Sequence, residues 1–126
     1  MRTYILAGFF SLCGLLSIAA DTPSSDTVIQ QRIVGTWLLN WIAFQCTTTI
    51  STNGDYVTYQ SNPRSRYEGT IKIKDGLWID TLKKCSVTNQ PVPHVFTNVI
   101  IRLTDHELIF RAQNGRQPMM WERVKQ

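Results

Sequence analysis

The chain has 126 residues, of which 43% are apolar and 17% charged, with 7 Gly and 5 Pro. This composition is that of an ordinary globular protein; it excludes collagen-like and disordered chains, and the length favours a single domain. The formal net charge is +4 and the basic residues stand singly or in pairs. Proteins that bind nucleic acid concentrate Lys and Arg in a stripe, so we expect no nucleic-acid partner.

Residues 1–20 have the pattern of a secretory signal peptide. Arg2 precedes an almost unbroken apolar run, which ends in the small residues Ala19 and Ala20. We therefore expect cleavage near Ala19/Ala20 and a secreted or periplasmic protein. A retained anchor is the alternative, but the polar residues 21–27, which we interpret as a linker, contain no basic stop-transfer cluster. We expect no stable membrane span and a folded domain over residues 28–126.

The folded domain begins with a short helical pattern and continues with strand patterns. Residues 28–33 have apolar side chains at near-helical spacing over too few residues for a stable free helix, which predicts at most one turn. Residues 33–44 then alternate with period two, which predicts a strand. One face of this strand carries Ile33, Gly35, Trp37, Leu39, Trp41 and Ala43.

Seven more segments have strand patterns: residues 47–52, 56–59, 67–73, 77–82, 95–103, 108–111 and 119–124. Several connections are short, and those at Asn53-Gly54, Asp75-Gly76 and Asn114-Gly115 are typical hairpin turns. The sequence therefore predicts an all-β antiparallel meander. With no helix to cover a face, eight strands avoid exposed edges most simply by closing into an up-and-down β-barrel. A sandwich of the same strands is the alternative.

Gly35-Thr36-Trp37 on the first strand resembles the Gly-x-Trp signature of the lipocalins and their calycin relatives. The nearest likeness is to short bacterial lipocalin-like domains, which share the hairpin at residues 53–56, the Trp-containing strand at 77–79 and the ending at 121–124. The likeness spans residues 28–124. The domain is shorter than a classical lipocalin, and the middle and late lipocalin motifs are not recognisable.

The resemblance implies structural roles for three residues. Trp37 would plug the closed end of the barrel, with the guanidinium of Arg123 lying across its indole. Such a contact contributes about 1 kcal/mol or more when it is desolvated, and it would tie the first strand to the last. Gly35 would allow close backbone approach in the crowded floor of the barrel.

No set of residues in the sequence has the pattern of a catalytic centre. His94 lies in a proline-containing loop and His106 in a tight turn, where surface positions are expected. Asp75 has the pattern of a turn residue, and Asp80 stands singly in a strand. The chain has no nucleophile elbow, phosphate loop or metal-binding His pair. We therefore expect no enzyme, no cofactor and no metal.

The order of the strands predicts different charges at the two ends of the barrel. Alternate connections share one rim, and one rim carries the basic residues Arg64, Arg66, Lys83, Lys84 and Arg116. The opposite rim carries the acidic residues Asp55, Asp75, Asp105 and Glu107. In lipocalins the first rim is the open mouth, so the resemblance implies a basic mouth that favours an anionic head group. The alternative is that this separation of charge is accidental.

A set of large side chains has the strand positions of an interior lining. These candidates are Trp41, Tyr56, Trp78, Val99, Ile101, Phe110 and Met119. In a barrel this short the same side chains can instead fill the interior as core. The leading hypothesis is a non-enzymatic, exported barrel that binds a small apolar or anionic amphiphilic ligand in its mouth. The alternative is a packed barrel whose rim loops contact a protein partner, as an envelope inhibitor or immunity-type factor.

The mature chain retains two cysteines, Cys46 and Cys85. An even number in an oxidising compartment predicts one disulfide. The two residues fall at the same end of the barrel but three strands apart, so flexible loops must bring them together. The expected loop over residues 83–93 permits this movement, and the bridge would then cross the mouth. Two free thiols, buried as small apolar side chains, are the alternative.

Overall fold

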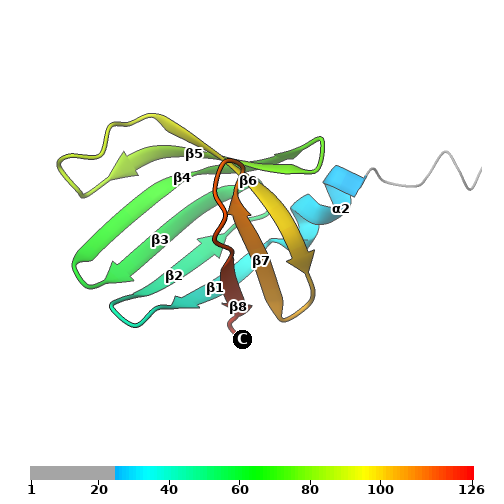
Figure 1. Cartoon of the computed structure of the whole chain (residues 1–126), viewed down its shortest axis with the longest axis horizontal. Coiled ribbons are helices and arrows are strands. Elements are labelled where there is room, and N and C mark those ends of the chain that lie inside the picture. The colour runs from blue at the N-terminus through cyan, green and yellow to red at the C-terminus, as the bar shows by residue number, and fades with distance from the viewer. Residues whose placement is uncertain (1–24) are drawn as a thin grey trace, which may run out of the picture.

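The computed structural model describes residues 25–126, so the predicted signal peptide and most of the predicted linker lie outside the described residues. In this range the elements are α2 (Ser25–Arg32), β1 (Gly35–Asn40), β2 (Gln45–Ile50), β3 (Asp55–Ser61), β4 (Arg64–Lys74), β5 (Leu77–Cys85), β6 (His94–Leu103), β7 (Glu107–Ala112) and β8 (Met119–Arg123). The strands pair in chain order, every pair is antiparallel, and β8 returns to β1. The predicted eight-stranded up-and-down barrel is confirmed (Figure 1).

The two ends of the barrel differ. Helix α2 and the β2–β3, β4–β5 and β6–β7 connections lie at one end, which we call the closed end and which is at the right in Figure 1. The β1–β2, β3–β4, β5–β6 and β7–β8 connections lie at the other end, which we call the mouth. The β4–β5 turn is tight because Asp75 and Gly76 both take positive φ, at 53° and 74°.

The closed end of the barrel is plugged by a tryptophan and an arginine. Trp37 is fully buried, and its Nε1 donates a hydrogen bond of 2.8 Å to the Ile33 carbonyl. The Arg123 guanidinium lies 4.2 Å from the centre of the Trp37 ring. It also donates to three backbone carbonyl oxygens, those of Arg32, Val34 and Asp105. Gly35 has a φ of 136°, which side-chain-bearing residues rarely adopt, and a Cβ there would lie 2.6 Å from Arg123 Nη1, so a glycine is favoured at this position.

Helix α2 is longer than the single turn that the sequence predicts. It spans 8 residues and includes residues 25–27 of the predicted linker. Contacts with the barrel explain the extra length. The Asp26 carboxylate accepts both backbone N–H groups of the β4–β5 turn, each at 2.8 Å. The Gln30 amide donates to Ile71 O at 3.2 Å and accepts from Ile73 N at 2.8 Å. These bonds stabilise a helix that is too short to form alone.

The sequence analysis assigned the wrong face of β6 to the interior over part of this strand. Val99 and Ile101 are not interior residues; Phe96 lines the interior and Ile100 packs against the core. A register shift between Ile100 and Arg102 leaves Ile101 52% exposed. Apolar residues stand on both faces of this strand, so alternation alone does not say which face is buried, and a bulge changes the alternation part of the way along.

The predicted Cys46–Cys85 disulfide is not present, and both cysteines are free. Cys46 lies on β2, opposite Gln60 of β3, and Cys85 lies on β5, opposite Tyr67 of β4. Strands β3 and β4 therefore lie between them, and three strand spacings amount to about 14 Å, against the ~4.4–6.8 Å that a disulfide allows between Cα atoms. The expected movement of a loop is excluded because β5 continues through Cys85.

Candidate functional site

The barrel interior is packed toward the closed end and contains two cavities toward the mouth. The largest fully buried side chains are those of Trp37, Trp78, Ile33, Ile50, Leu108 and Thr48. Toward the mouth from these side chains lies a cavity of 380 Å³ lined by Trp41, Trp78 and Trp121, which we call the tryptophan cavity. A second cavity of 300 Å³ is lined by Tyr56 and Tyr67, and we call it the tyrosine cavity.

The two cavities adjoin and reach the surface at the mouth. They share part of their lining, which is Asp80, Phe96, Met119 and Trp121. Trp41 and Phe96, which line the tryptophan cavity, are 48% and 41% exposed. Side chains that line a cavity and are half exposed mark its opening. The interior is therefore accessible from the mouth.

Three aromatic rings from different strands form one wall of the tryptophan cavity. The ring centres of Trp78 and Phe110 lie 4.8 Å apart, and the Trp121 ring stands nearly perpendicular to both, at 5.4 Å and 5.0 Å. The indole Nε1 atoms of Trp78 and Trp121 are buried without a hydrogen-bond partner among the described residues. An unpaired buried donor costs about 1–3 kcal/mol, so this wall is not optimised as a core.

Asp80 and Tyr56 place one polar contact within this apolar interior. The Tyr56 hydroxyl donates a hydrogen bond of 2.7 Å to Asp80 Oδ1. The two residues belong to β3 and β5, so the tyrosine side chain crosses β4, where Gly69 is its register partner. A Cβ at Gly69 would lie 2.9 Å from the Tyr56 ring and hydroxyl. The missing side chain at Gly69 thus makes room for the contact.

Burial shifts the titration of both members of the pair. It raises the pKa of Asp80 from 3.8 to about 6, although the hydrogen bond from Tyr56 opposes the shift. Burial, together with the charge of Asp80, raises the pKa of Tyr56. Tyr56 therefore stays a neutral donor, whereas Asp80 changes its charge near pH 6. Among the described residues, no Lys, Arg or His lines either cavity.

Most of the expected interior residues line the cavities. Trp41, Trp78 and Phe110 line the tryptophan cavity, Tyr56 lines the tyrosine cavity and Met119 lines both. The structure also brings in residues that the sequence analysis did not select, namely Asp80, Phe96 and Trp121. Strand alternation contained a signal for Asp80, because it falls on the same face as Trp78 and Leu82.

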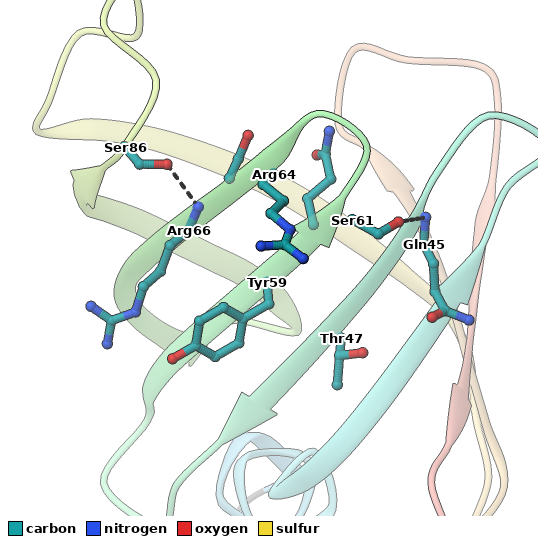
Figure 2. Close-up of a pocket in the computed structure, with 9 residues that line it drawn as sticks. Gln45, Thr47, Tyr59, Ser61, Arg64, Arg66 and Ser86 are labelled. Carbon is teal, nitrogen blue, oxygen red and sulfur yellow. Dashed lines mark hydrogen bonds between the residues drawn. The ribbon is translucent and has the colours of Figure 1, made fainter.

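The predicted basic residues lie at the mouth end but outside the cavities. Lys83, Lys84 and Arg116 are exposed, and none of them lines either cavity. Arg64 lines a separate surface groove of 610 Å³ along β2, β3 and β4 (Figure 2). In that groove the Arg66 guanidinium lies 5.6 Å from the centre of the Tyr59 ring. Arg66 also pairs with Glu68 at 2.7 Å.

Within residues 25–126, no three His, Cys, Asp or Glu side chains are grouped so that they could hold a metal ion. In the same part of the chain, no helix has the length and apolar character needed to cross a bilayer. No family model, no curated protein and no solved structure matches the chain.

Proposed function

We propose that this protein is an exported binding protein that holds a small, mainly apolar ligand inside its barrel. The observation that carries the proposal is the pair of adjoining cavities behind the mouth, at 380 and 300 Å³. Ordinary ligand pockets occupy about 300–1,000 Å³ and are mainly apolar with a few polar groups. The aromatic lining with one Tyr–Asp contact has this character. The proposed export rests on the apolar run before Ala19 and Ala20.

Interior volume also separates this function from the alternative. A barrel that acts only through its rim loops needs no interior space, and a cavity below roughly 100 Å³ would favour that role because it is too small for a ligand. Both cavities are larger than this limit. The unpaired indole donors of Trp78 and Trp121 support the same conclusion, because a ligand that offers an acceptor atom could satisfy them.

The basic residues suggest where an anionic ligand would place its head group. Lys83, Lys84 and Arg116 are exposed outside both cavities. An anionic amphiphile would therefore keep its charge at the mouth and place only its apolar part inside. We propose the lipocalin-like assignment on the same basis, since a barrel with a plugged closed end and a hollow mouth is what the resemblance implies.

Binding of a hydrophobic dye tests the proposed function. N-phenylnaphthylamine should fluoresce more strongly when it enters the barrel. Ala112, which lines the tryptophan cavity, can be replaced by Phe to fill part of that space. Ala112→Phe should weaken dye binding by about fivefold or more, whereas Ala43→Phe in the exposed β1–β2 loop should not. Failure of the dye to bind, or equal binding by both variants, would contradict the proposal.

A further inference from the structure

Asp80 is a carboxylate without a balancing cation. It lines both cavities, and its Oδ1 accepts the hydrogen bond from Tyr56. No other Asp or Glu and no basic residue of the described chain lines either cavity. The ion pairs among residues 25–126 involve other carboxylates, those of Asp105, Glu68 and Glu107. Among the described residues, the lining of the two cavities therefore has one acidic group and no positive charge.

Such an arrangement is unfavourable for a structural core. A buried charge that lacks a partner destabilises a folded protein, and cores ordinarily place an apolar or neutral residue in such a position. Titratable groups whose environment is unfavourable in this way gather at binding and catalytic sites. Asp80 also lies at the junction of the two cavities, where any ligand that extends through them must pass.

The rings around Asp80 are suited to a positive charge. Trp41, Phe96 and Trp121 line the tryptophan cavity together with Asp80, and Tyr56 contacts the carboxylate directly. The faces of aromatic rings attract cations, and cages of such rings recognise ammonium groups. The Asp80 carboxylate would repel an anion, and no described basic side chain lines the cavities to bind one. The lining as a whole is complementary to an apolar body that carries one cationic group.

We propose that the ligand is an organic amine whose ammonium group binds the Asp80 carboxylate, while its apolar body lies among the rings of the tryptophan cavity. This inference rests on the proposed function and specifies its ligand class. Tyr56 positions the carboxylate and keeps one oxygen occupied, which leaves the ammonium to bind beside it. The basic residues at the mouth lie outside the lining and do not take part in this recognition.

Three probes that share one apolar body test the inference: phenylbutylamine, phenylbutanol and phenylbutanoate. Their affinities can be measured from quenching of the intrinsic tryptophan fluorescence, because Trp41, Trp78 and Trp121 line the cavity. At about pH 7.5 the amine should bind at least about tenfold more tightly than the alcohol, because an ionised hydrogen bond is stronger than a neutral one. Asp80→Asn should reduce this preference to less than about threefold, because the ammonium group then loses its ionised partner.

The outcomes distinguish the inference from the proposed function. If the alcohol and the amine bind the native protein equally, or if the acid binds best, the amine inference is wrong and the binding function stands. If Asp80→Asn keeps the full preference for the amine, Asp80 is not its site. If none of the three probes and no N-phenylnaphthylamine binds, both proposals fail. Retained binding of the alcohol by Asp80→Asn shows that the variant is folded.

Discussion

At the scale of single residues, Asp80 is where the stability of the fold and the proposed binding of a ligand have opposite requirements. Its carboxyl is partly buried, and the hydrogen bond from Tyr56 does not offset the cost of burying the charge. Burial dominates, so the pKa rises instead of falling as it does for most paired carboxylates. A group whose pKa is higher in the folded state than in the unfolded state stabilises the fold only while it is protonated.

This sign leads to a pH-dependent stability difference for Asp80→Asn. The contribution of Asp80 is fully present below about pH 3.8 and is lost as the pH rises through about 6. The titratable groups that line the tyrosine cavity with it are Tyr56, Tyr67 and Cys46. At about pH 7.5 the variant should be more stable than the native protein by about 1–2 kcal/mol, after allowance for partial solvent screening.

Chemical denaturation at two pH values measures this effect. At about pH 4 the gain of Asp80→Asn should nearly vanish, because the native carboxyl is then neutral as well. Asp105→Asn is the matched control, since the Asp105 side chain is 89% exposed and its loss of charge should stabilise at neither pH. A gain that is equal at both pH values would show that burial of the Asp80 charge does not limit stability.

The residues of the candidate site were only partly predictable from the sequence. Trp41, Trp78 and Phe110 could be assigned to the interior because large apolar side chains on the inward face of a strand are usually buried. The Tyr56–Asp80 contact was not predictable, because it joins two strands that are not neighbours. It depends on the missing side chain of Gly69 on the strand between them, and no spacing along the chain encodes that relation.

At the scale of elements, helix α2 illustrates structure that is imposed by its neighbours. Its own sequence has no buried residue and is too short to be stable alone. The Gln30 side chain nevertheless donates to one backbone group of β4 and accepts from another. A glutamine amide can do this because it carries a donor and an acceptor side by side. The helix is thus joined to the sheet in the manner of a short extra strand.

Neighbouring glutamines provide a matched test of this contact. Gln30→Ala removes both hydrogen bonds to β4, whose partners are part-buried, and should lower the free energy of unfolding by about 1–2 kcal/mol. Gln31→Ala makes the same change at the next, exposed position and should alter stability by less than about 0.5 kcal/mol. Urea denaturation of the two variants measures both values. Equal changes in the two variants would mean that the contact of Gln30 with β4 does not hold α2.

Element boundaries were less predictable than element order. The hairpin signals at Asn53-Gly54 and Asp75-Gly76 located the turns correctly, because Gly54, Asp75 and Gly76 take the positive φ that tight turns require. Strand β5 was expected to end at Leu82, with a loop over residues 83–93. In the structure both lysines remain in the strand, where they are exposed, and pairing continues through Cys85. That extension is what removes the expected disulfide.

At the scale of the whole molecule, the barrel has one weak seam. Strands β4 and β5 pair over eight residue pairs, whereas β1 and β8 pair over two, at Trp37–Arg123 and Leu38–Glu122. These two pairs lie at the closed end, beside the plug. Toward the mouth, β1 and β8 continue without pairing with each other, whereas β8 stays paired with β7. The tryptophan cavity lies next to this gap, since its lining includes Trp41, just after β1, and Met119, where β8 begins.

The seam predicts where the barrel opens most readily. Amides of residues 119–121 should exchange with deuterium at least about tenfold faster than those of residues 70–73. The latter segment is paired with β5 on one side, and on the other side Ile71 N and Ile73 N donate to Gly54 O and to the Gln30 side chain. Hydrogen exchange followed by mass spectrometry on the native protein measures both segments. N-phenylnaphthylamine should slow exchange at residues 119–121 and leave residues 70–73 unchanged, because a molecule in the tryptophan cavity contacts Met119 and Trp121. Equal protection of the two segments in the native protein would contradict opening of the barrel at the β1–β8 seam, and with it the entry of a ligand there.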